Sequence, residues 1–187
     1  LVARLDPVKD HKTFLHAAAD LARQKPNVRF ICVGGGPNGY ADELRCLGDS
    51  LGLGRRLIWA GERDDVSGVL NALDIATLCS AYGEGFPNAV GEGMAMALPF
   101  VTTDVGDAAR VVGDTGIVVP IASPEVLAAA WLQLTEMTSE ARAHAGAAAR
   151  ARIVTCFPRS TMIEKTSELL RGTLPQKADP QALGESS

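Results

Sequence analysis

The sequence has no long apolar run, few aromatic residues and no surplus of positive charge. Aromatic residues make up 5% of the 187 positions. Every apolar stretch falls well short of the ~20 residues that span a bilayer, which predicts a soluble chain. The 18 basic residues are outnumbered by 22 acidic ones, for a net charge of −4. Because nucleic-acid-binding domains usually carry a basic surplus, nucleic acid is not expected as a partner.

Cysteine and histidine are also sparse and widely spaced. The four cysteines, Cys32, Cys46, Cys79 and Cys156, include no Cys-x-x-Cys pair, and the three histidines complete no metal-ligand spacing with them. Cys32 and Cys79 lie inside apolar runs, where cysteine acts as a small buried hydrophobe. The pattern indicates reduced structural thiols of a cytosolic protein and no metal site.

What the sequence does have is the composition of a folded domain. Hydrophobic residues make up 47% of it, and 187 residues are enough for one α/β domain with its own core. The chain opens on Leu-Val-Ala-Arg, with neither a methionine nor a signal peptide, and residues 1–3 resemble the end of a strand. These features indicate an excised segment, so the missing targeting signal is uninformative.

Short apolar runs alternate with stretches of helical apolar spacing. The runs predict strands at Val28–Gly34, Leu57–Gly61, Asp74–Cys79, Pro99–Thr103 and Ile117–Val119. The stretches between them predict helices at His11–Gln24, Tyr40–Leu51, Val66–Leu73, Asn88–Ala97 and Pro124–Leu134. Strands joined through single helices must be parallel, and continuously apolar strands are covered on both faces. The prediction is an open, doubly wound α/β sheet of about five or six parallel strands, whose ligands bind at the carboxyl ends of the strands.

The end of the chain has a different character. Ser139–Thr155 is rich in alanine and arginine, Arg159–Arg171 is amphipathic, and Pro158 separates them, which predicts two C-terminal helices. From Gly172 the sequence is polar, contains proline and glycine, and has no periodicity. The domain is therefore expected to span residues 1–171, followed by a disordered tail over residues 172–187.

The segment most indicative of a ligand site is Tyr82–Glu92, which follows a predicted strand and enters a helix. Gly83 and Gly85 let the backbone approach a ligand, and the free N–H groups at the helix start attract an anion. Glu84 and Glu92 are placed to face one pocket, where carboxylates accept hydrogen bonds from sugar or ribose hydroxyls. A solvated loop and helix is the alternative, and for the segment as a whole it is the weaker interpretation.

Two cations follow the first strand-like residues. Arg4 and Lys9 lie between that strand end and the helix predicted at His11–Gln24, and both can reach across the strand ends. Together they would neutralise a diphosphate and stabilise it as a leaving group. Either cation alone is more simply a surface charge, but the pair beside the Glu84 segment indicates a site.

Three further loops are weaker signals. Gly34–Pro37 resembles a phosphate-cradling loop, but it lacks the Gly-x-Gly-x-x-Gly order and is equally well a tight turn. Trp59–Arg63 can lie against a nucleobase, although Trp59 alternates within its strand and its ring is expected in the core. Thr102–Asp107 either lines the sugar end of a ligand or is a plain turn.

Taken together, these segments resemble the C-terminal domain of the group 1 family of retaining glycosyltransferases, which have the GT-B fold. The family pattern is Gly-Arg-Leu followed by a lysine, then Val-Gly-x-Gly-Pro, then Glu-Gly-Phe-(Pro/Gly) with a second glutamate on the following helix. The matching positions, within residues 1–134, are Arg4-Leu5 with Lys9, Val33–Pro37, and Glu84–Pro87 with Glu92. The block with two glutamates is the specific part of the resemblance, and the glycine turn is not.

The resemblance implies a Rossmann-like domain that binds a nucleoside diphosphate sugar, such as a UDP- or GDP-sugar, as donor substrate. Arg4 and Lys9 would hold the diphosphate, Glu84 would meet the donor sugar, and these three would be the catalytic groups. Glu92 would hold the ribose hydroxyls. The full set of implied binding residues is Arg4, Lys9, Gly35, Glu84, Gly85, Phe86, Pro87, Asn88, Ala89, Val90 and Glu92. The family transfers sugar with retention of configuration, usually without a metal or other cofactor, so the two cations take over the charge neutralisation of a metal ion.

The resemblance also implies that an N-terminal domain is absent from this chain. In the family that domain carries the acceptor site, so the chain alone is expected to bind donor weakly and not to turn over. Acceptors in the family range from lipid-linked saccharides to small metabolites, which favours polysaccharide or cell-envelope synthesis by association. The full-length enzyme is expected in the cytoplasm, with peripheral association at the inner face of the membrane.

Three positions depart from the family pattern. Ala3 stands in place of a glycine, Gly93 in place of an alanine, and Gly106–Arg110 in place of Gly-Gly-x-x-Glu. The last departure leaves the choice of donor open.

Other classes of protein remain as alternatives. They are a sugar-nucleotide epimerase of the same fold, a non-catalytic nucleotide-sugar-binding module, and a dinucleotide-binding domain. Two glutamates together with two cations argue against a decayed site. A dinucleotide-binding domain needs Gly-x-Gly-x-x-Gly after its first strand, and this chain reads Arg-Leu-Asp-Pro-Val-Lys there. A phosphorylase needs a lysine for pyridoxal phosphate, and no local segment indicates one.

Overall fold

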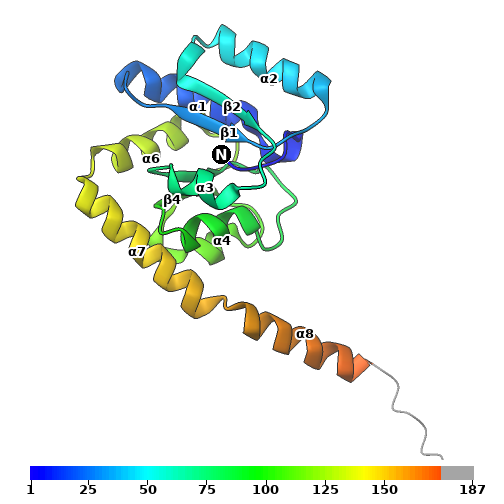
Figure 1. Ribbon diagram of the computed structural model, residues 1–187. Coiled ribbons are helices and arrows are strands. Elements are labelled where there is room, and N and C mark those ends of the chain that lie inside the picture. The colour runs from blue at the N-terminus through cyan, green and yellow to red at the C-terminus, as the bar shows by residue number, and fades with distance from the viewer. Residues whose placement is uncertain (174–187) are drawn as a thin grey trace, which may run out of the picture.

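The computed structural model describes residues 1–173, in which strands and helices alternate along the chain (Figure 1). The strands are β1 (Phe30–Val33), β2 (Leu57–Gly61), β3 (Ala76–Leu78), β4 (Phe100–Thr103) and β5 (Ile117–Val119). The helices are α1 (His11–Gln24), α2 (Asn38–Ser50), α3 (Val66–Asn71), α4 (Asn88–Ala95), α5 (Ala108–Val112), α6 (Pro124–Glu136), α7 (Ser139–Cys156) and α8 (Arg159–Thr173). This order confirms the predicted α/β class.

The named strands pair in parallel, because every connection between paired strands passes through a helix. β1 pairs with β2, and β3, β4 and β5 form a second sheet in that order. Residues 1–3 extend the first sheet beyond β1. The amide of Ala3 donates to the carbonyl of Val33, and the amide of Val33 donates to the carbonyl of Leu1, each over 2.9 Å. The described strands thus form two sheets where the sequence predicted one.

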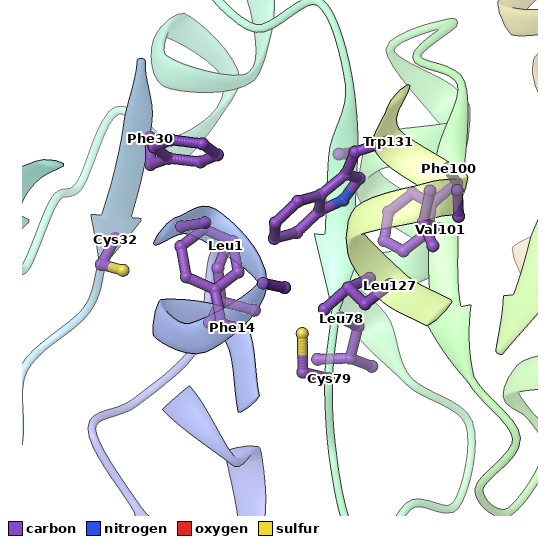
Figure 2. Close-up of a cluster of buried hydrophobic side chains, with 14 of the residues drawn as sticks. Leu1, Phe14, Phe30, Cys32, Leu78, Cys79, Phe100, Val101, Leu127 and Trp131 are labelled. Atoms are coloured by element: carbon purple, nitrogen blue, oxygen red, sulfur yellow. The ribbon is translucent and has the colours of Figure 1, made fainter. Parts of the chain in front are cut away.

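A cavity of about 790 Å³ lies between the two sheets. Leu1 and Phe30 line it on the β1 side, and Ile75 and Trp131 line it on the other. Figure 2 shows Phe30 and Trp131 facing each other across the space between β1 and the second sheet. Within residues 1–173 no strand pairs with both β1 and β3, so the parallel strands form two separate sheets.

Helices α1 and α6 pack against each other and close one end of the core (Figure 2). The face of α1 predicted from its spacing is buried, with Leu15 and Ala18 fully inaccessible. Trp131 of α6 packs edge-on against Phe14 of α1, with ring centroids 5.1 Å apart. Its indole N–H donates to the hydroxyl of Thr77 over 2.9 Å, which satisfies a polar group that is costly to bury alone.

Helices α4, α5 and α7 form the other half of the domain. α4 packs against β3, β4 and α7, and α5 packs against β4. Met94 and Val90 of α4 are fully buried in this half. The sequence did not predict α5, because five residues are too few to show a helical period.

Helix α7 packs against α4, whereas α8 extends away from the rest of the molecule (Figure 1). α8 continues to Thr173, two residues past its predicted end, and the rest of the predicted disordered tail lies outside the described residues. The side chains of Met162 and Ile163 on α8 are exposed. No helix in this described part of the chain is long and apolar enough to cross a membrane.

Gly93 and Phe100 form a matched pair in the core, and we expect substitutions at the two positions to be coupled. A β-carbon at position 93 would lie 2.5 Å from Cε2 of the Phe100 ring. Gly93→Ala should therefore lower the free energy of unfolding by about 1 kcal/mol or more, because overpacking outweighs the gain in helix propensity. In a Phe100→Leu background the same change should be neutral or stabilising. Urea unfolding of the four proteins measures the coupling, and additive effects would contradict the pairing.

His11, the first residue of α1, is a buried polar side chain. It is fully inaccessible, and neither ring nitrogen has a hydrogen-bond partner among the described residues. Burial is the main cause that lowers the pKa of His11 to about 4, against the opposing effect of Asp10. The imidazole is therefore neutral at pH 7.

Stability should fall as this histidine is forced to protonate. The folded pKa of about 4 lies below the ordinary histidine pKa of 6.5, so the unfolded chain binds the proton first. The stability present above pH 6.5 is therefore lost as the pH falls towards 4. We expect His11 to account for a loss of about 2 kcal/mol between pH 7 and pH 4.5. Urea titrations of the parent chain and of His11→Leu across this range test the assignment. A pH dependence unchanged in His11→Leu would assign the loss to other groups.

Candidate functional site

The site lies where several loops meet at the carboxyl ends of the parallel strands. The amide of Ala81, after β3, donates to the carbonyl of Val8 over 2.8 Å, so the loop before α1 is tied to the loop after β3. Gly106, after β4, has a φ of +56°, and a β-carbon there would lie 1.8 Å from the carbonyl oxygen of Glu84. A glycine is therefore needed for this close approach, and three loops converge on Glu84.

An ion pair between Lys9 and Glu84 forms the centre of the site. Lys9 Nζ lies 2.5 Å from Glu84 Oε1, and the two side chains are 19% and 8% exposed. The hydroxyl of Ser80 donates to the same carboxylate oxygen. The sequence predicted both charged residues for the site, and the structure brings together two groups 75 positions apart.

Local backbone structure places Lys9. It is the last residue of a short 3₁₀ turn, Pro7–Lys9, which Asp6 caps by accepting a hydrogen bond from the amide of Val8 over 2.9 Å. Asp10 follows in the left-handed conformation, with a φ of +45°, and its carboxylate caps α1 through the amide of Thr13. This tight turn directs the lysine back over the strand ends.

The glycine loop after β1 is held by the same N-terminal segment. Gly34 has a φ of +138°, and a β-carbon there would lie 2.1 Å from the carbonyl oxygen of Ala3. The amide of Leu5 donates to the carbonyl of Gly35 over 2.7 Å. At Gly36 a β-carbon would lie 2.3 Å from the Leu5 carbonyl oxygen. Glycine is therefore required at positions 34 and 36, where the backbone of this loop lies against the backbone of the N-terminal segment. This close approach supports the interpretation of the loop as a tight turn.

Helix α4 begins at this site with open backbone groups. Pro87 is its N-cap, one position before the first helical residue, and no side chain of residues 1–173 caps this end. The amides of Val90 and Gly91 already donate to the carbonyl of Pro87, whereas those of Asn88 and Ala89 precede them in the first turn. The partial positive charge of a helix N-terminus favours an anion there.

The remaining predicted residues are arranged less closely. Arg4 has a side chain that is 78% exposed, and its Nη2 lies 3.8 Å from Asp6 Oδ2. Glu92 is exposed on α4, without an ion pair in the described part of the chain. The side chain of Val90 is fully buried, so this position offers a ligand only its backbone. The ring of Phe86 packs near that of Phe157, with centroids 5.6 Å apart.

Sequence reasoning missed the polar groups behind Glu84. Ser80 is fully buried, and its carbonyl accepts a hydrogen bond from the hydroxyl of Thr103 over 2.7 Å. Thr103 stands at the end of β4, within the Thr102–Asp107 segment, which the sequence predicted either to line the sugar end of a ligand or to be a plain turn. A serine just past a buried strand and four positions before Glu84 was a usable signal for the first of these groups.

Two of the four cysteines, Cys32 and Cys79, are buried in the core. Burial raises the pKa of the Cys32 thiol to about 11 and raises that of Cys79 as well, so both stay protonated at neutral pH. Cys46 and Cys156 are exposed and unpaired. In the described part of the chain no group of three or more His, Cys, Asp or Glu side chains is placed to hold a metal ion.

The ion pair at the centre of the site should be sensitive to the loss of one partner. Lys9→Met leaves the Glu84 carboxylate largely buried without its cation, and we expect it to lower the free energy of unfolding by about 2 kcal/mol. The double variant Lys9→Met/Glu84→Gln should regain more than half of this loss, because no unpaired charge remains. Lys12→Met is the control, since Lys12 pairs with Glu43 while about half exposed. Equal losses in the two single lysine variants, by urea unfolding, would contradict the role of burial.

The fold and the site define a Rossmann-like α/β domain with a charged site at the carboxyl ends of its strands. Residues 1–137 match the family model described as glycosyl transferases group 1, and the chain belongs to this family. A curated relative, D-inositol 3-phosphate glycosyltransferase of Corynebacterium efficiens, is 30% identical over 193 residues, which cover 95% of this chain and 45% of the relative. The chain thus spans about half the length of that relative.

Solved structures share this architecture. The Anabaena protein Alr3699/HepE in complex with UDP-glucose is 26% identical, with a TM-score of 0.84, and the match covers 91% of this chain and 47% of that one. The C-terminal domain of the group 1 protein LpcC from Francisella tularensis has a TM-score of 0.75 at 21% identity, over 83% of this chain and 84% of that domain. The second likeness shows the fold alone, and it matches this chain to a C-terminal domain.

Proposed function

We propose that this chain is the donor-binding half of a glycosyltransferase that takes a UDP- or GDP-sugar. The observation that carries the proposal is the Lys9–Glu84 pair, a cation and a carboxylate in contact at the strand ends. A nucleoside diphosphate sugar has a negative part and a hydroxyl-bearing part next to each other. A neighbouring cation and carboxylate match those two parts.

On binding, Lys9 exchanges the carboxylate for the diphosphate. Arg4, which is exposed, adds a second cation, and the amides of Asn88 and Ala89 add the helix N-terminus. Glu84 then accepts hydrogen bonds from the sugar hydroxyls, and Glu92 does so from the ribose. Gly35, Gly85, Phe86, Pro87 and Val90 contribute backbone and shape. The complexes of Alr3699/HepE with UDP and with UDP-glucose support this class of ligand.

The reaction we propose moves the sugar from diphosphate to acceptor. The bond between the anomeric carbon and the diphosphate oxygen breaks, and its electron pair leaves with the nucleoside diphosphate. The acceptor hydroxyl oxygen forms the new bond to the same carbon with retention of configuration, and its proton leaves with the diphosphate. Lys9 and Arg4 stabilise the leaving group, a role that a metal ion has in other enzymes. The acceptor site belongs to a second domain of the whole protein.

The proposal defines the acceptor only by its chemical class. The curated relative's name specifies D-inositol 3-phosphate, and the family resemblance implies lipid-linked saccharides among the acceptors. We propose a saccharide or lipid-linked acceptor in polysaccharide or cell-envelope synthesis, with the whole enzyme in the cytoplasm at the inner membrane face.

Calorimetric titration with UDP, GDP, UDP-glucose and NAD tests the donor site. We expect saturable binding of one nucleoside diphosphate and its sugar, and no binding of NAD. Lys9→Ala and Glu92→Ala should each weaken the diphosphate by about tenfold, the effect of one charged hydrogen bond. Lys12→Ala and Glu43→Ala are matched controls, because these two residues pair with each other on α1 and α2.

The outcomes separate the classes of protein. Binding of NAD alone would contradict the proposal and favour a dinucleotide-binding domain. Equal weakening in the control variants would show that the change in net charge, and not the loss of a site residue, weakens binding. With full-length protein, transfer to an acceptor supports a glycosyltransferase, and interconversion of the sugar without transfer supports an epimerase.

A further inference from the structure

Ser80 lies behind the charged pair, where water does not reach it. It is the second residue after β3, and it is fully inaccessible. Its hydroxyl donates to Glu84 Oε1, and its carbonyl accepts a hydrogen bond from the hydroxyl of Thr103 over 2.7 Å. β3 and β4 therefore jointly fix the position of the serine. A buried hydroxyl without a hydrogen-bond partner would cost free energy, and the Ser80 hydroxyl avoids this cost by donating to Glu84.

The two donors to Glu84 converge on the same oxygen atom. Lys9 Nζ lies 2.5 Å from Oε1, and the Ser80 hydroxyl donates to that atom too. Within residues 1–173, Oε2 accepts no hydrogen bond from a side chain or from the backbone. One oxygen of the carboxylate is thus held by the protein, and the other is left for a ligand.

A bound ligand would affect the two donors to Glu84, Lys9 and Ser80, differently. Lys9 is a cation that a diphosphate attracts, and its side chain is 19% exposed. Ser80 is neutral and fully buried, so it has no route to the ligand. When Lys9 turns towards a diphosphate, the serine is the donor that remains on Oε1. Hydrogen bonds to a charged acceptor are short and strong, and they restrict a side chain with three rotatable bonds.

We propose that Ser80 is a positioning residue that holds Glu84 Oε1 while Lys9 exchanges it for the diphosphate, so that Oε2 meets the sugar hydroxyls. This inference rests on the proposed function. Thr103 supports the arrangement by fixing the backbone of Ser80. The serine acts through Glu84 and contributes to recognition of the sugar, not of the nucleotide.

The first test compares a ligand with the sugar to a ligand without it. Calorimetry with UDP-glucose and UDP should show that Ser80→Ala weakens UDP-glucose about tenfold and UDP less than about twofold. Ser80→Thr, which keeps the hydroxyl, should restore the preference for UDP-glucose. In a Glu84→Gln background, Ser80→Ala should have no further effect, because the two residues act as one unit.

Thr77→Val is the matched control for a purely structural effect. Thr77 carries a buried hydroxyl on β3, three positions before Ser80, and it accepts a hydrogen bond from Trp131 and not from the site. This variant should lose stability without changing the ratio of the two affinities. Equal weakening of UDP and UDP-glucose by Ser80→Ala, or additivity with Glu84→Gln, overturns the positioning role.

A second measurement decides the inference without any ligand. In crystals of the ligand-free chain, Glu84 should occupy one conformer in the parent and in Ser80→Thr, and several in Ser80→Ala. An unchanged single conformer in Ser80→Ala overturns the inference even if UDP-glucose binds. Failure of the parent chain to bind UDP, GDP, UDP-glucose or a GDP-sugar counts against the proposed function instead, and the conformers of Glu84 still decide the role of Ser80.

Discussion

The ion pair between Lys9 and Glu84 is the interaction on which the rest of the site depends. It joins the turn before α1 to the loop before α4, two segments that the chain places far apart. A carboxylate that is 8% exposed needs a compensating donor, and Lys9 and Ser80 both supply one. The surrounding backbone is arranged to permit this contact. Gly106 lets the loop after β4 lie against Glu84, and the Gly34 loop supports the segment that carries Lys9.

This arrangement makes the ligand-free site self-neutralising. The cation and the carboxylate satisfy each other until a molecule with both a negative group and hydroxyl groups replaces each partner with a better one. In the proposed exchange Lys9 gains the diphosphate and Glu84 gains hydrogen bonds from the sugar hydroxyls, so the carboxylate keeps donors at a place that lies mostly out of water. A bare anion gains Lys9 but leaves Glu84 with Ser80 alone, so the arrangement itself favours a ligand that carries both groups.

Much of the fold was predictable because its signals are local. The buried face of α1 follows from residues three and four apart, and β2, β4 and β5 were predicted to within a residue of their observed bounds. The division of the sheet was not predictable, because it depends on which strands meet across space. The short helix α5 escaped notice for lack of length. The glycine in place of alanine at position 93 was a plain departure in the sequence, and only the packing of the Phe100 ring supplies a reason for it.

The sequence by itself determined the residue types of the site and the strand ends at which they stand: Arg4 and Lys9 after residues 1–3, and Glu84 with Glu92 around the start of α4. These follow from spacing and from the rule that ligands bind at the carboxyl ends of parallel strands. The tertiary structure alone decided which of them touch. It paired Lys9 with Glu84, left Arg4 and Glu92 exposed, and added the Ser80 hydroxyl behind the carboxylate. The reason is physical: hydrogen bonds and burial act over a few ångströms between segments 75 positions apart, and no local pattern in the chain encodes that distance.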